Sequence, residues 1–133
     1  MNTTPKNFRK RNAIYNCLCQ SKAHPSAEAI YTQLKTEIPD LSLGTVYRNL
    51  NLFKDQGLVI SVATVQGVER FDGNTSPHVH FICNDCAAII DLEDMEVPKA
   101  LTTAAERSTG GKVAECQLTF NGICKNCINK LEN

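Results

Sequence analysis

Two Cys-x-x-Cys pairs constrain the fold of this chain more than any other feature of its sequence. They are Cys83/Cys86 and Cys124/Cys127, four of the seven cysteines in 133 residues. Each pair can clamp a metal ion from one turn, and two such pairs match the spacing of a tetrahedral zinc site with four cysteine ligands. A zinc ion (Zn2+) held there would staple the C-terminal tail to an earlier strand pair and stabilise a small domain. Two redox-active dithiols, or reduced thiols without metal, are the alternatives.

The cysteine count and the absence of membrane or secretion signals indicate a cytoplasmic chain. No run of eighteen apolar residues is present, so we expect no membrane span. The N-terminus is basic without a long apolar region, so we expect no signal peptide. An odd number of cysteines suits metal ligation in a reducing compartment better than a secreted disulfide framework. Cys17 and Cys19 are expected to pack in or beside the first helix.

The two halves of the chain carry opposite charge although the net charge is zero. Residues 1–57 hold eight lysines and arginines against four acidic residues, whereas residues 58–133 hold six against ten. A basic half joined to an acidic half predicts that the first half contacts nucleic acid. A solvated surface is the alternative explanation for so modest an excess.

The first half has the pattern of a winged helix. Apolar residues at helical spacing predict a helix over residues 9–20, and Pro25 and Ser26 mark the start of a second. A third helix is expected to begin after Ser42 as N-cap and to end at Gly57. The β-branched stretch that follows, up to Asp72, contains a Gln-Gly turn and predicts a hairpin. In a winged helix the third helix enters the major groove of DNA.

The second half alternates strands with a helix, which makes the whole chain an α+β protein. A linker composition, "GNTSP", separates the halves. We therefore expect an N-terminal winged helix-turn-helix DNA-binding domain, a linker and a small C-terminal α/β domain, at residues 1–72, 73–77 and 78–133. The expected elements of the last part are strands 78–83 and 87–92, helix 96–108, strand 112–120 and a short final helix.

Histidines and aspartates form a second candidate metal site. His78 and His80 share one face of the expected strand, and Cys83 falls on the other face. Asp72 ends the hairpin and Asp91 ends the next strand, and such imidazole and carboxylate ligands suit iron, manganese or zinc. A polar strand edge with loose acidic residues is the alternative. The third histidine, His24, precedes Pro25 at a helix start, where a local interpretation is only that it caps the helix.

The motifs "HPSAEAIY", "LSLGTVYRNL", "ERFDGNTSPHVHFICNDCAAIID" and "GICKNC" lie in this order between residues 24 and 127, within a match that spans roughly residues 9–127. With them the chain resembles the ferric uptake regulator family of metal-dependent transcription factors. The resemblance implies a homodimer, in which the C-terminal domain serves dimerisation, and a structural zinc on the four paired cysteines. It also implies a regulatory metal, Fe2+ or Mn2+, bound between the domains by His24, Asp72, His78, His80 and Asp91.

Within the family, the chain is most similar to the peroxide-sensing branch. Iron-sensing members commonly have glutamates where this chain has Asp72 and Asp91, and Cys116 replaces a histidine that often serves an additional metal site. Arg48 is a departure, since peroxide-sensing members often have asparagine there. The resemblance implies that peroxide oxidises a metal-bound histidine, and His24 and His78 match the oxidised positions. The chain also begins later than family members usually do, so we expect some DNA contacts or dimer support to be missing.

The expected DNA-binding residues lie on the third and first helices. Arg48 is the expected base reader, because arginine can pair with a guanine edge through two hydrogen bonds. Basic side chains of the first helix are expected to contact phosphates, which raises affinity without specifying sequence, although surface solubility also explains them. The full set is Ser42, Thr45, Tyr47, Arg48, Arg9, Lys10 and Arg11.

These features predict a metal-dependent repressor that binds a palindromic operator in double-stranded DNA and is not an enzyme. Hydrogen peroxide would be sensed through oxidation of histidine ligands at a regulatory Fe2+ site. One alternative is an iron-, manganese- or zinc-responsive repressor without peroxide sensing. A more distant alternative is a mononuclear metalloenzyme. Two observations speak against it: the ligands are spread over two domains, and no substrate pocket is implied.

Overall fold

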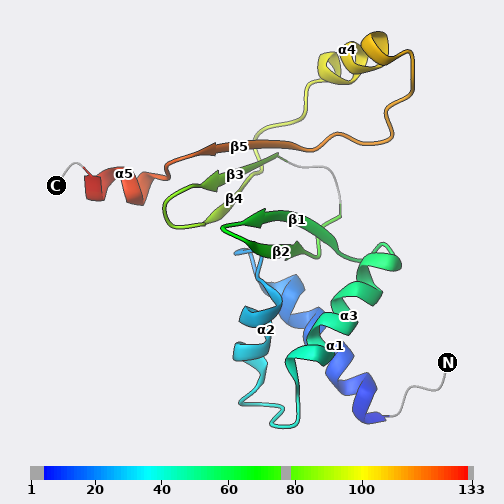
Figure 1. The fold of residues 1–133 in the computed structure, drawn as a ribbon, viewed down its shortest axis with the longest axis vertical. Coiled ribbons are helices and arrows are strands. Elements are labelled where there is room, and N and C mark those ends of the chain that lie inside the picture. Colours follow the sequence, from blue (N-terminus) through cyan, green and yellow to red (C-terminus); the bar gives the residue numbers. More distant parts are fainter. Residues whose placement is uncertain (1–4, 76–78, 132–133) are drawn as a thin grey trace. The chain divides into compact units, whose positions relative to one another are not determined.

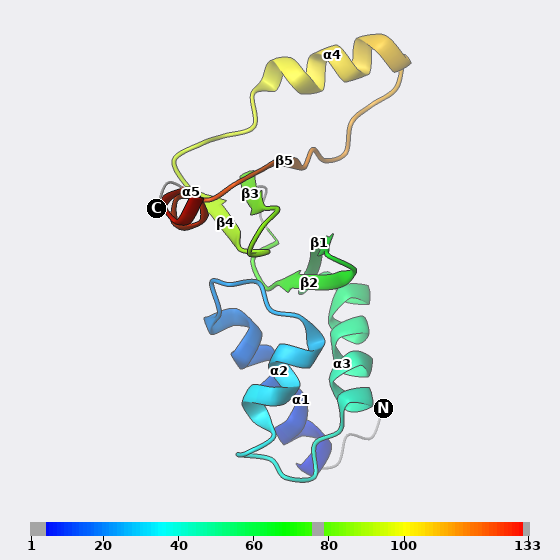
Figure 2. The same ribbon diagram turned by 60° about the vertical axis from the view of Figure 1, so that its left-hand side comes forward.

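The computed structural model describes residues 5–75 and 79–131 (Figures 1 and 2). The chain divides into two compact units, and the division falls between Thr75 and Ser76. This position lies inside the segment 73–77, where the sequence composition predicts a linker. Each unit has its own secondary structure and its own buried cluster, so the two are described in turn.

Three helices begin the first unit. They are α1 (Pro5–Gln20), α2 (Ala27–Leu34) and α3 (Leu43–Asp55). Serine side chains cap two of them, because Ser26 Oγ accepts from the Ala29 amide and Ser42 Oγ accepts from the Thr45 amide, each at 3.1 Å. The helix start expected near residue 9 is thus at Pro5.

A Schellman motif ends α3. Gly57 has a left-handed φ of 76°. Its amide donates to the Lys54 carbonyl at 3.0 Å, and the next amide, that of Leu58, donates to the Phe53 carbonyl at 2.9 Å. The helix itself ends at Asp55, and the prediction that Gly57 follows it as the C′ residue is confirmed.

The apolar faces of the three helices form one core. Val46, Leu50 and Phe53 of α3 are buried, and Leu43 packs partly against this core. Tyr15 of α1 meets Phe53 edge-on, with ring centroids 5.3 Å apart. The other buried apolar residues of this core are Ile14, Cys17, Leu18, Ala27, Ile30, Leu34, Ile38, Leu41, Val59 and Phe71.

A β-hairpin completes the first unit. Strands β1 (Ile60–Val65) and β2 (Val68–Asp72) pair in antiparallel fashion. The turn between them is the predicted Gln-Gly dipeptide, and both Gln66 and Gly67 have positive φ, as a type I′ turn requires. Phe71 anchors the hairpin in the helical core, with a side chain that is 1% exposed. The expected helix order followed by a wing is therefore confirmed.

The second unit contains a three-stranded sheet. Its strands are β3 (Val79–Cys83), β4 (Ile89–Leu92) and β5 (Leu118–Gly122), in the order β4-β3-β5. β4 runs antiparallel to β3, whereas β5 runs parallel to it. A parallel neighbour needs a long connection, and helix α4 (Lys99–Thr109) lies in that connection. Helix α5 (Lys125–Leu131) follows β5.

Three elements of the second unit have other bounds than the sequence predicts. β4 begins at Ile89 instead of 87, because Ala87 has a left-handed φ of 63°. α4 begins at Lys99 instead of 96, because Pro98 is its N-cap and proline disfavours helical backbone in the residue before it. β5 spans Leu118–Gly122 instead of 112–120, because Leu118 pairs with Val79, the first residue of β3.

Apolar side chains stay exposed on the second unit. No residue of α4 is buried, and both views show this helix set apart from the sheet of its own unit (Figures 1 and 2). Across the sheet, Phe81 pairs with Ile90 on one side and with Phe120 on the other. Ile90 and Phe120 are 43% and 42% exposed, so this cross-strand row lacks a cover within the described chain.

None of the helices within residues 5–75 and 79–131 is long and apolar enough to cross a membrane.

The first unit should depend on Leu50, which is fully buried in the helical core. Leu50→Ala should lower the free energy of unfolding by about 2–5 kcal/mol, because it removes apolar contacts and leaves a cavity. Leu58→Ala is the matched control, since Leu58 is 43% exposed. It should change the free energy of unfolding by less than about 0.5 kcal/mol. Urea unfolding followed by the helical circular dichroism signal measures both. Equal losses in the two variants would contradict this assignment of the core.

Candidate functional site

The four paired cysteines gather at one end of the sheet. Cys83 ends β3, Cys86 lies in the following turn, Cys124 precedes α5, and Cys127 is in its first turn. The Sγ atoms of Cys83 and Cys127 are 3.8 Å apart, as are those of Cys86 and Cys124. All four Sγ atoms lie within 4.8 Å of one another. A tetrahedral zinc ion with Zn–S bonds of about 2.3 Å requires Sγ–Sγ distances of about 3.8 Å, so the cluster fits zinc.

Backbone amides prepare this cluster for a cation. The amides of Cys86 and Cys124 each donate to Cys83 Sγ at 3.4 Å. These hydrogen bonds favour the thiolate and lower the pKa of Cys83 to about 6. Burial, in contrast, raises the pKa of Cys127. A buried thiol beside other sulfurs gives up its proton when a metal ion compensates the charge, and the thiolate is the form that binds metal.

Local backbone geometry closes the turn around Cys83 and Cys86. Left-handed Ala87 donates its amide to the Cys83 carbonyl at 3.1 Å, and the Asn84 amide donates to the Gly122 carbonyl at 2.7 Å. The second bond ties the first cysteine turn to the end of β5, from which Cys124 follows. Three of the four cysteines are buried, which is typical of a closed structural site. Each motif contacts the other motif, which favours one shared metal over two local dithiols.

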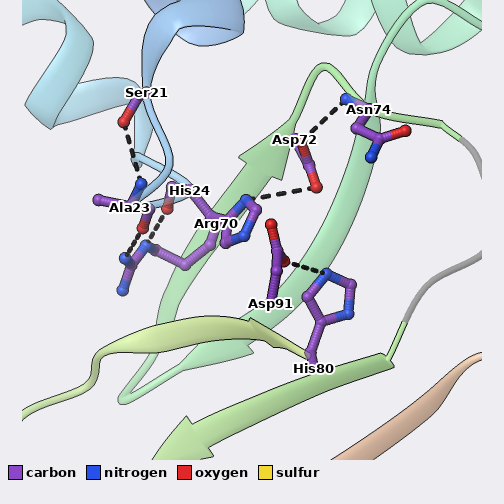
Figure 3. A network of polar contacts seen from close by, with 8 residues as sticks. All are labelled: Ser21, Ala23, His24, Arg70, Asp72, Asn74, His80 and Asp91. Atoms are coloured by element: carbon purple, nitrogen blue, oxygen red, sulfur yellow. Dashed lines mark hydrogen bonds and ion pairs between the residues drawn. The ribbon is translucent and has the colours of Figure 1, made fainter. Parts of the chain in front are cut away.

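One histidine–aspartate pair belongs to the first unit. His24 lies in the loop before α2 and Asp72 ends β2, and His24 Nδ1 is 3.3 Å from Asp72 Oδ2 (Figure 3). Both side chains are buried. The other carboxylate oxygen of Asp72, Oδ1, accepts from the Asn74 amide at 2.8 Å, which fixes the carboxylate. His24 does not cap α2, because Ser26 does so.

The other histidine–aspartate pair belongs to the second unit. His80 of β3 and Asp91 of β4 face each other in the sheet register, with His80 Nε2 3.3 Å from Asp91 Oδ1 (Figure 3). Strand alternation places Cys83 on the opposite face from His80, as the sequence predicts. His78, the remaining predicted ligand, lies outside the described residues. Each pair offers an imidazole nitrogen and a carboxylate oxygen, a donor set that suits Fe2+, Mn2+ or Zn2+.

Four predicted DNA-binding residues lie at the start and on the outer side of α3. Ser42 Oγ and Thr45 Oγ1 are hydrogen-bonded at 2.9 Å, and an Arg48 Nη donates to the same Thr45 oxygen at 2.9 Å. The N-cap of the helix is thereby connected to its arginine. Tyr47 donates its hydroxyl proton to Glu28 Oε1 of α2 at 2.6 Å. This contact lowers the pKa of Glu28 and raises that of Tyr47.

The basic residues of α1 border a groove beside α3. Lys10 pairs with Asp40 at 3.3 Å, and Arg11 Nε donates to Asn49 Oδ1 of α3 at 3.1 Å, whereas Arg9 is exposed. The groove has a volume of about 320 Å³ and gathers Lys10, Arg11 and Arg48. Asn49 was not predicted as part of this surface. Its only sequence signal is its position one helical turn after Thr45, whose carbonyl accepts from Asn49 Nδ2 at 2.9 Å.

Comparisons with known proteins agree on one family. Residues 2–121 match the model of the ferric uptake regulator family. The peroxide operon regulator of Bacillus subtilis is 38% identical over 121 residues, which cover 91% of this chain and 83% of that protein. The peroxide-responsive repressor PerR of Staphylococcus aureus is 35% identical, with 91% and 81% covered. The crystal structure of the Campylobacter jejuni peroxide stress regulator superposes with a TM-score of 0.77 at 28% identity, with 92% and 91% covered.

The cysteine cluster predicts tightly bound zinc. The purified protein should contain about one zinc ion per chain at this cluster, and Cys127→Ser should lose it, because a serine hydroxyl is a poor ligand for zinc beside three thiolates. The second unit should then lose its ordered structure. Elemental analysis after chelator treatment and the melting temperature measure these effects. Cys116→Ser, a change outside the cluster, should keep the zinc; loss of zinc in this control as well would contradict the assignment.

Proposed function

Since this chain belongs to the ferric uptake regulator family, we propose that it is a homodimeric repressor that releases DNA when peroxide oxidises a histidine ligand. Members of this family are metal-responsive DNA-binding regulators and not enzymes. Two histidine–aspartate pairs, each with a nitrogen–oxygen distance of 3.3 Å, are the observation that carries the proposal. Of their four residues all but Asp91 are buried. The names of the similar proteins from Bacillus subtilis and Staphylococcus aureus support the choice of peroxide as the signal.

The two candidate metal sites are proposed to bind different metals for different purposes. In the proposal, Cys83, Cys86, Cys124 and Cys127 hold a structural zinc. The regulatory metal, Fe2+ or Mn2+, is bound by His24, Asp72, His78, His80 and Asp91. All-sulfur ligands favour zinc, whereas nitrogen and oxygen ligands accept iron and manganese, so the two sites need not compete for the same ion. The geometry of each described pair supports its own half of the regulatory set.

Ligands from both units make the regulatory metal a coupling device. His24 and Asp72 come from the first unit and the other three ligands from the second. Ligation by all five would favour one arrangement of the DNA-binding domains, and a dimer must space its α3 helices about 34 Å apart to read a palindrome. Metal and operator DNA would then each strengthen binding of the other.

Peroxide acts on the histidines in this proposal. Ferrous iron held by these residues would supply the reducing chemistry that activates hydrogen peroxide next to the imidazole rings. Overall, the ring of His24 or His78 gains one oxygen atom, and the peroxide is reduced to water. The oxidised ring is a weaker ligand, so the metal and then the operator are released. Manganese on the same residues leaves the histidines intact, because it reacts poorly with peroxide.

The DNA contacts are proposed from the surfaces of α3 and α1. Arg48 reads a base, helped by Ser42, Thr45 and Tyr47. Arg9, Lys10 and Arg11 contact phosphates, and the basic groove between the two helices supports this role. The operator is proposed to be a palindrome, as the two-fold symmetry of a homodimer requires.

The homodimer is proposed to form through the second unit. Phe81, Ile90 and Phe120 form an apolar row on the sheet, and α4 adds exposed Leu101. Exposed apolar surface of this kind is typical of an interface. A transcriptional repressor of this class acts where the DNA is, so we propose that the protein is cytoplasmic.

The peroxide response should be visible as a mass change. Iron-loaded protein treated with low micromolar hydrogen peroxide should gain one oxygen on His24 or His78 and release operator DNA. Manganese-loaded protein, treated identically, should show neither change. Peptide mapping by mass spectrometry, with DNA binding followed in parallel, tests this. Unmodified histidines, with DNA binding set only by metal supply, would leave a metal-responsive repressor without peroxide sensing.

Two arginines should affect DNA binding differently. With an operator selected from a random library, Arg48→Ala should reduce the free energy of DNA binding by about 1–3 kcal/mol and relax the sequence preference at one base pair. Arg9→Ala should weaken binding to all sequences and make the dependence on salt shallower, because a phosphate contact carries no sequence information. Fluorescence anisotropy on matched and mismatched duplexes at several salt concentrations separates the two. Uniform weakening by Arg48→Ala would show that this arginine contacts only the backbone.

A further inference from the structure

Arg70 of the wing forms hydrogen bonds with the backbone of the loop that contains His24. Its Nε donates to the His24 carbonyl, and an Nη donates to the Ala23 carbonyl at 2.5 Å (Figure 3). The guanidinium group is a planar fork with fixed donor directions, so two bonds to successive carbonyls define the path of the backbone between them. No motif in the sequence predicts this contact, which joins residues more than forty positions apart.

The loop that contains His24 has an unusual backbone conformation. His24 has a left-handed φ of 52°. For a residue with a side chain, this conformation is energetically unfavourable and persists only where surrounding contacts hold it. A second contact lies beside the arginine, because the Phe71 amide donates to the Pro25 carbonyl at 3.0 Å. The strand β2 therefore fixes the carbonyl groups of Ala23, His24 and Pro25 in succession.

The same strand also supplies the aspartate that faces His24. Arg70 and Asp72 are two positions apart on β2, so both project from the same side of the strand. Arg70 sets the backbone of His24, and Asp72 receives its imidazole, with Nδ1 and Oδ2 3.3 Å apart. The geometry of this half of the metal site is thus set by one strand of one unit.

We propose that Arg70 is a positioning residue, which prepares His24 for the metal by holding the left-handed loop. This inference rests on the proposed regulatory site, since it assigns a role to a neighbour of two of its ligands. Charge does not explain the role, because a guanidinium near a cation site opposes cation binding. Loss of Arg70 should therefore strengthen metal binding if charge dominates and weaken it if position dominates.

The test compares Arg70→Gln and Arg70→Lys in the full-length, zinc-containing protein. Mn2+ affinity is measured by competition with a metal-binding dye, and amide hydrogen exchange of residues 21–26 is measured without Mn2+. Arg70→Gln should weaken Mn2+ binding by about 10–100-fold, as loss of a group that orients a ligand typically does. Exchange in the loop should become faster. Arg70→Lys keeps the charge but loses the fork, so it should also weaken binding, by a smaller factor.

Controls separate this inference from the site on which it rests. Arg107→Gln removes an exposed arginine of α4 and should leave both readouts unchanged. Amide hydrogen exchange within α3 and the zinc content report whether each variant is folded. If Arg70→Gln does not fold, the comparison is made with Arg70→Lys alone. Unchanged or tighter Mn2+ binding by the folded Arg70 variants, while His24→Ala loses Mn2+, would overturn the role of Arg70 alone. Unchanged Mn2+ binding by His24→Ala would instead overturn the proposed metal site.

Discussion

The second unit depends on the four-sulfur cluster more than on apolar packing. Helix α4 buries no residue, and the sheet leaves Ile90 and Phe120 exposed. Among the described residues of this unit, the buried apolar side chains besides the cysteines are those of Val79, Ile82 and Ile89. Small domains with so little buried surface need a staple such as a metal or disulfides. The cluster joins β3, the turn after it, the end of β5 and α5. Its Sγ–Sγ distances of 3.8 Å match a single tetrahedral ion.

The sequence alone predicted the features that are local along the chain. A few consecutive residues are enough to predict the geometry of a Cys-x-x-Cys pair, of the N-cap serine before α3 and of the Gln-Gly turn. The structure confirms the helix caps and the turn. The start of β5 was wrong, because β propensity over residues 112–120 does not specify which of them find a partner strand. Arg70 and Glu28 were missed for a related reason. Their partners are far away in the sequence, and such contacts leave no periodic pattern.

Ser42, one of the proposed DNA contacts, already has a structural role. Ser42 caps α3 through the Thr45 amide, and its hydroxyl also meets the Thr45 oxygen that receives Arg48. Side chains held by such networks lose less freedom on binding, which is the physical meaning of pre-organisation. Tyr47 differs, because its hydroxyl is already bound to a carboxylate, that of Glu28. A phosphate in its place would have to displace that carboxylate.

The position of the second cysteine pair along the chain has a consequence for biosynthesis. Cys124 and Cys127 follow every strand of both units, so the sulfur cluster is complete only after all strands have been made. The first unit draws its core entirely from earlier residues and can form while the second is still being translated. A nascent chain can therefore acquire a folded DNA-facing unit before the proposed zinc site is complete. In a cell short of zinc, we expect chains to accumulate with the first unit folded and the second open to proteolysis.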